Sequence, residues 1–134
     1  MPSGRRHYRI TLSDVWDAHD AALAMGGGRP GTLNPALIES AIGRPYVGYH
    51  RSIESKAAAL VQSMATNHGF ADGNKRTTVV LMNVLLERSG YRLQTAGGDA
   101  ALQDEIEAMV LGVIDRSVGF DALVGWFRER VRRA

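Results

Sequence analysis

Residues 79–86 are apolar except for one asparagine, and this run constrains the fold more than any other part of the chain. A run of this length with polar residues on both sides predicts a helix buried in the core. The segment just before it, residues 68–76, combines one histidine, one aspartate, one asparagine, two glycines and two cations. We therefore expect this polar segment to lie where the central helix begins.

The start of that helix has the properties of an anion-binding site. A helix N-terminus presents backbone N–H groups without intrahelical partners and the positive end of the helix dipole. Lys75 and Arg76 have the wrong charge for a first helical turn, where acidic residues are favoured. Binding of a polyphosphate would explain both cations. Asp72, directly before the turn, supplies a carboxylate suited to the magnesium ion that such a ligand carries.

Composition excludes several other classes of protein. A length of 134 residues is that of one domain, and we expect residues 1–134 to form a single one. The chain has no cysteine, which excludes thiol catalysis, disulfides and cysteine-ligated zinc. A formal net charge of +2 is too small to indicate nucleic-acid binding. No apolar run approaches the ~20 residues that span a bilayer, so we expect no membrane partner.

Helix start and stop signals predict an all-α fold of about six helices with almost no strand. The predicted helices cover residues 12–25, 35–42, 56–67, 74–89, 99–114 and 120–133, and residues 91–94 are expected to be extended. We expect Ser55 to cap the third helix, Gly90 to end the central one, and the glycines at 26–28 to stop the first. Residues 44–54 are expected to be irregular or to form a small hairpin.

Polar residues outside the motif are interpreted as structural. His19 and His50 are lone histidines, and such residues are more often structural than ligand-binding. The acidic residues Asp104, Glu105 and Glu107 are interpreted as the solvated face of a helix rather than a catalytic carboxylate pair.

Residues 68–76 read HGFADGNKR, which resembles the signature of the Fic/Doc family, H-x-F-x-(D/E)-(A/G)-N-(G/K)-R. The lysine at position 75 is typical of the Doc branch, and Gly69 departs from the proline that many members have. Shorter matches at residues 18–20, 41–44 and 88–91 extend the resemblance over about residues 12–127. The resemblance implies a compact Fic-type helical bundle with a short flap near residues 44–53 that aligns the target chain.

The resemblance also implies an activity, the transfer of a group from ATP to the hydroxyl of a protein. His68 would be the general base that takes the hydroxyl proton, because an imidazole with a pKa near ~6.5 accepts a proton at neutral pH. Asp72 would bind Mg²⁺ bridging the phosphates. The residues that would bind the phosphates are Gly73, Asn74, Lys75 and Arg76.

Three functions remain open. Doc-type members phosphorylate elongation factor Tu on a threonine and stop translation; there the lysine in the position of Lys75 fills the space beside the α-phosphate. The resemblance therefore implies a cytoplasmic toxin with kinase activity, with elongation factor Tu as target and a small cognate antitoxin as second partner. The first alternative is an adenylyltransferase acting on a protein Ser, Thr or Tyr. The second is a catalytically inactive Fic-fold binding module.

Overall fold

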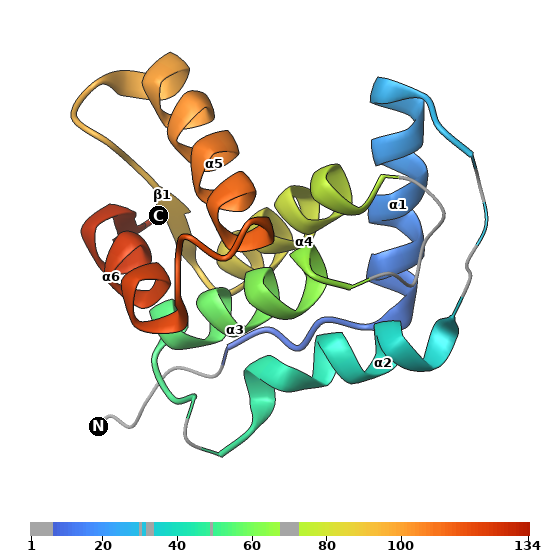
Figure 1. The fold of residues 1–134 in the computed structure, drawn as a ribbon. Helices are drawn as coiled ribbons and strands as arrows, with labels where there is room; N and C mark the ends of the chain where they lie inside the picture. The colour runs from blue at the N-terminus through green and yellow to red at the C-terminus, as the bar shows by residue number, and fades with distance from the viewer. Residues whose placement is uncertain (1–6, 30, 32–33, 49, 68–72) are drawn as a thin grey trace.

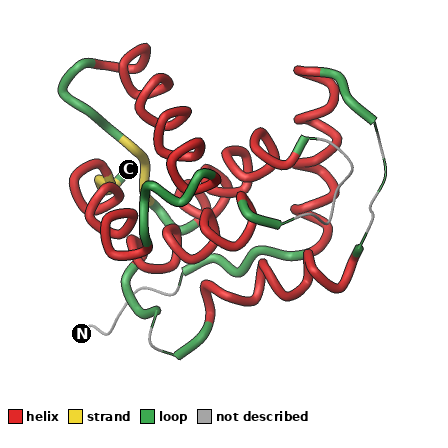
Figure 2. Tube along the Cα trace, viewed as in Figure 1, coloured by secondary structure: helices red, strands yellow, loops and turns green. Residues whose placement is uncertain are grey.

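The computed structural model describes residues 7–29, 31, 34–48, 50–67 and 73–134. Within this part, the α-helices are α1 (Leu12–Gly26), α2 (Pro35–Gly43), α3 (Ile53–Ala65), α4 (Asn74–Arg88), α5 (Gly98–Ile114) and α6 (Phe120–Arg130) (Figure 1). A 3₁₀ turn, η1 (Arg44–Tyr46), follows α2, and the short strand β1 (Tyr91–Leu93) pairs antiparallel with β2 (Val131–Arg133). Helices dominate the trace (Figure 2), which confirms the predicted all-α fold of about six helices.

Helix α4 is buried in the core beside α3, which contacts α2, η1, α4, α5 and α6. Its apolar side chains at Leu81, Met82 and Leu85 are fully buried, as the run at residues 79–86 predicted. Helix α4 packs most extensively against α3 and α1, and α6 covers the other side of α3. In Figure 1, α4 passes between α1 on one side and α5 on the other. Packing against α1 and α3 therefore fixes where the N-terminus of α4 lies.

Local capping explains where several helices begin. The Thr11 hydroxyl accepts a hydrogen bond from the Asp14 backbone N–H at 3.1 Å, and the Asp14 carboxylate accepts one from the Thr11 N–H at 2.9 Å. This reciprocal capping box fixes the start of α1. Asn34 caps α2 with Pro35 at the first helical position. Gly90 follows α4 with φ +89°, in the left-handed conformation predicted for it.

Two predicted helix boundaries are wrong. Helix α3 begins at Ile53 rather than at residue 56, because Ser52 is its cap and accepts from the Ser55 N–H at 3.0 Å. The predicted cap, Ser55, instead bonds His50 Nδ1 through its hydroxyl at 2.7 Å. The final helix ends at Arg130 rather than at residue 133, because residues 131–133 pair with β1 as a strand.

The segment expected to be irregular or a hairpin contains η1, and its described residues form no strand. Tyr46 in this turn accepts a hydrogen bond from the Ile10 N–H and donates one to the Tyr8 carbonyl, both at 2.7 Å. These bonds tie η1 to the chain that precedes α1. None of the helices described here combines the length and the apolar character that a bilayer span requires.

Candidate functional site

Helix α4 begins at Asn74, where the sequence predicted the start of the central helix. Its N-cap, Gly73, has φ +84° and ψ +10°, a left-handed conformation that glycine adopts without a steric penalty. The first intrahelical bond runs from the Thr77 N–H to the Gly73 carbonyl at 2.9 Å, and none of the described side chains caps the helix at Gly73. The first amides and the helix dipole therefore point positive charge outward from the start of α4.

The predicted general base and the predicted magnesium ligand lie outside the described residues. These are His68 and Asp72, with Gly69 and Phe70 between them. Their roles stay predictions. Among the described residues, no group of three histidine or acidic side chains is arranged to hold a metal ion.

The four predicted phosphate-binding residues line one cleft. It is enclosed by the end of α1, the start of α4 and one face of α5, and its volume of about 720 Å³ is within the range of small-molecule sites. The residues at its basic end are Gly73, Asn74, Lys75 and Arg76. Side chains of Val79, Val80 and Val110 form part of its apolar wall. The structure thus brings the motif's cations to the mouth of a nucleotide-sized cleft.

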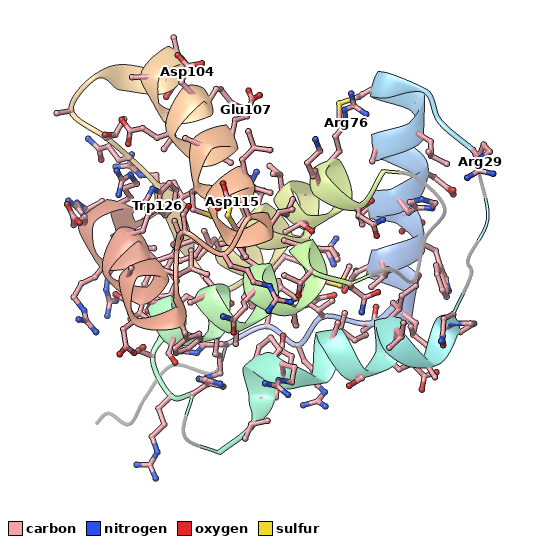
Figure 3. The ribbon with its side chains drawn as sticks, in the orientation of Figure 1. Arg29, Arg76, Asp104, Glu107, Asp115 and Trp126 are labelled. Atoms are coloured by element: carbon pink, nitrogen blue, oxygen red, sulfur yellow. The ribbon has the colours of Figure 1, made fainter. Side chains whose placement is uncertain are left out.

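Arg76 is held at this cleft by the end of α1. Its guanidinium packs directly on Gly26, the last residue of α1, and a Cβ atom added at Gly26 would overlap it. The C-terminal end of a helix carries negative dipole charge, which favours a cation at this point. In Figure 3, Arg76 lies beside the end of α1, and Glu107 on α5 lies across the cleft. Residues 26–28, interpreted from sequence as a helix stop, also form part of the site.

Helix α1 also supports the N-cap of α4. A Cβ atom placed at Gly73 would lie 3.5 Å from two atoms of the His19 ring and 3.5 Å from Leu23 Cδ2. His19 is 5% exposed, in agreement with its interpretation as structural, but sequence reasoning did not place it at the site. The available signal was spacing, because His19, Leu23 and Gly26 follow at i, i+4 and i+7 and so share one face of α1.

The acidic wall of the cleft was also missed. Asp104 and Glu107 are exposed, as a solvated helix face should be, but both line the cleft opposite Arg76. Their i, i+3 spacing puts them on the same face of α5. Glu105 lies on another face and pairs with Arg130 at 2.7 Å; this hydrogen bond lowers the pKa of Glu105. A cleft with cations at one end and carboxylates across from them suits an anion that carries its own metal cation.

Comparison with known proteins gives consistent matches. Residues 9–86 match the Fic/DOC family, a range that runs from before α1 into the last turn of α4. The chain is 36% identical over 72 residues to "Toxin Doc" of Mycolicibacterium smegmatis, covering 50% of this chain and 55% of that protein. It is 31% identical over 88 residues to "Protein kinase doc" of Escherichia phage P1, covering 63% of this chain and 70% of that protein. The chain therefore spans about half the length of the first relative.

Proposed function

The chain belongs to the Fic/DOC family, and on that premise we propose that it is the toxin of a toxin–antitoxin pair and transfers phosphate from ATP to a protein hydroxyl. The observation that carries the proposal is the cleft at the start of α4, which Lys75 and Arg76 line. The relatives named "Toxin Doc" and "Protein kinase doc" support it. We further propose that the acceptor is a threonine of elongation factor Tu, which would place the protein in the cytoplasm.

In the proposed reaction, His68 takes the proton of the acceptor hydroxyl. The acceptor oxygen forms a bond to the γ-phosphorus, the bond from that phosphorus to the β–γ bridging oxygen breaks, and ADP leaves. The amides at the start of α4 hold the phosphates in place, and Lys75 and Arg76 neutralise the charge on their oxygens. Asp72 would hold Mg²⁺, which would neutralise more of the phosphate charge when bound.

Lys75 favours phosphate transfer over the alternative of adenylyl transfer. Family members with glycine at this position leave room for a backbone amide to contact the α-phosphate. Lys75 lines the cleft, and we infer that its long, charged side chain fills that space. The γ-phosphate rather than the α-phosphate is then expected to face the acceptor.

The mass of the product tests the proposal. The protein is incubated with ATP, Mg²⁺ and elongation factor Tu, and the intact mass of the factor is measured. Addition of one phosphate supports the proposal, whereas addition of one AMP would show that the protein is an adenylyltransferase. A His68→Ala variant with an unchanged circular dichroism spectrum should leave the factor unmodified. If the wild-type protein also leaves it unmodified while His68→Ala still arrests growth, the inactive binding module is the better reading.

We propose that a cognate antitoxin shields the cleft until the toxin is needed. Two large apolar side chains on the cleft wall are exposed, Met25 at 69% and Leu111 at 43%. Exposed apolar residues clustered beside charged ones are typical of protein-binding sites. Expression of this chain alone should arrest growth, and co-expression of the gene beside it should restore growth. Unimpaired growth at high expression of the chain alone would count against a toxin.

A further inference from the structure

A second pocket shares none of its lining residues with the nucleotide cleft. It lies between α2, α3 and the connection from α5 to α6, and its volume is about 690 Å³. Hydroxyl and amide side chains line part of it: Ser40, Gln62, Ser63, Thr66 and Asn67. Apolar side chains, including Phe120 and Val113, line another part. A concave site of this size with both kinds of lining is typical of small-molecule binding.

The charge of this pocket is one-sided. Arg44 from η1 and Arg116 from the connection after α5 both line it, and no aspartate or glutamate among the described residues does. The ion pairs found in the described part of the chain leave both arginines unneutralised. Burial lowers the pKa of the nearby His50, and the positive charges of Arg44 and Lys56 lower it further. Among the described lining residues, Arg44 and Arg116 are therefore the side chains that carry a formal charge.

Arg116 has a backbone conformation that an arginine rarely adopts. Its φ is +68°, and it is the one non-glycine residue with a positive φ in the part of the chain described. It directly follows the C-cap of α5, Asp115, in a turn closed by a bond from the Val118 N–H to the Gly112 carbonyl at 3.0 Å. Glycine is the usual residue at this position of a helix end. Strained residues cluster at ligand-binding sites, and Arg116 lines this pocket.

The start of α6 adds to the positive potential. Its N-cap, Gly119, and its first residue, Phe120, both line the pocket; among the described residues no side chain caps this helix, and Asp121 is the acidic residue of its first turn. The described part of the chain thus supplies no side-chain acceptor for the first amides of α6, and the positive end of the helix dipole lies at the pocket wall. The Phe120 ring lies 5.3 Å from the His50 ring and provides an aromatic surface next to the charged groups.

We propose that this pocket binds a phosphorylated small molecule whose phosphate engages Arg44 and Arg116 and whose organic part packs on Phe120. A phosphate monoester carries a charge of about −1.5 to −2 at neutral pH, which matches the two arginines. Each guanidinium can bind phosphate through two parallel hydrogen bonds. A carboxylate carries one negative charge and would neutralise only one of the two arginines. Thr66 and Asn67, which line the pocket, directly precede His68 in the sequence.

The test uses phenyl phosphate as the probe, with inorganic phosphate and phenylacetate as comparison ligands. Binding is followed by NMR chemical-shift titration of the full chain, which reports each pocket separately. Phenyl phosphate should shift the signals of Arg116, His50 and Phe120 and bind more tightly than either comparison ligand. If inorganic phosphate binds equally well, the organic part does not contribute and that half of the proposal is wrong.

Variants separate binding from folding. Arg44→Gln and Arg116→Gly should each weaken binding at this pocket about tenfold, the effect expected of one lost charged hydrogen bond. Arg116→Gly should also raise Tm, because glycine relieves the positive φ, so weaker binding could not be ascribed to unfolding. Arg128→Gln removes the same charge near the other end of α6 and should bind as the wild type does.

Two results would overturn the proposal. The first is an Arg116→Gly variant that binds phenyl phosphate with unchanged affinity. The second is loss of all phenyl phosphate binding in Arg76→Gln, which would place the probe in the nucleotide cleft instead. Arg76→Gln alters only the nucleotide cleft. If the proposed function fails, phenyl phosphate still shifts the signals of the second pocket; if the present proposal fails, those signals do not shift.

Discussion

Replacing Gly26 with alanine should weaken nucleotide binding while leaving the fold intact. The added Cβ atom would occupy the position of the Arg76 guanidinium, so that side chain must leave the end of α1. Gly26 is the last residue of α1 and has no positive φ, so alanine fits its backbone. The group that must move is the guanidinium of Arg76, the flexible end of an exposed side chain. The free energy of unfolding should therefore change by less than about 0.5 kcal/mol, as for other surface substitutions.

The expected loss in binding follows from the bond that Arg76 makes to phosphate. A hydrogen bond to a charged group contributes about 1.5–3 kcal/mol. Arg76 is exposed, so solvent screening places its contribution at the lower end of that range. We expect a dissociation constant for Mg²⁺·ATP about tenfold higher, which corresponds to ~1.4 kcal/mol. Isothermal titration calorimetry measures the dissociation constant, and urea unfolding measures the stability.

A matched control and a mutant cycle isolate the cause. Gly43 is also the last residue of a helix, α2, but a Cβ atom there would meet nothing within 4 Å. Gly43→Ala should therefore bind Mg²⁺·ATP like the wild type. In an Arg76→Ala background, Gly26→Ala should cause no further loss, because the side chain that it displaces is already absent. An equal loss in both backgrounds, or wild-type affinity in Gly26→Ala alone, would show that Gly26 does not position Arg76.

Three further predictions concern stability. Gly73→Ala should destabilise the fold by about 1 kcal/mol in urea unfolding, because alanine is strained at φ +84°; a stabilised variant would contradict this conformation. Leu85→Ala should cost about 2–5 kcal/mol, because the side chain is fully buried in the core; a loss below 1 kcal/mol would be too small for that environment. Burial raises the pKa of Asp14, but hydrogen bonds from Tyr8 and Thr11 outweigh it and hold that pKa below 3.8. Its stabilisation is present above pH 3.8 and is lost as the pH falls through the lowered pKa. Asp14→Asn should therefore destabilise at pH 7, and its difference from the wild type should shrink as the pH falls below 3.8; a difference that does not change with pH would show that the carboxylate charge is not involved.

Features that depend on neighbours within about one helical turn were predictable. The apolar run at residues 79–86 was sufficient to predict the buried central helix, and Asn34 with Pro35 was sufficient to predict the start of α2. The cationic start of α4 followed from the charge of two adjacent residues. In each case the determining interactions are backbone hydrogen bonds, caps and side-chain periodicity along a single element.

The sequence predicted a wrong boundary where a segment can adopt two alternative local structures. Ser52 and Ser55 can each cap a helix, and the choice of Ser52 leaves the Ser55 hydroxyl to bond His50. Residues 131–133 have a helical pattern as an isolated segment, but hydrogen bonds to β1 convert them to a strand. Those bonds join residues about forty positions apart, and no local pattern reports them.

The sequence by itself therefore determined the class of fold, the central helix and the place where the candidate phosphate-binding residues begin. Only the tertiary structure decided which residues surround them. Gly26 lies under Arg76 because α1 packs on α4, and Glu107 lies across the cleft because α5 packs on α3, the neighbour of α4. The second, basic pocket arises in the same way, from Arg44 and Arg116 on separate elements. Caps and apolar periodicity act within a turn or two of chain, whereas a pocket is formed by side chains that meet only after the helices have packed.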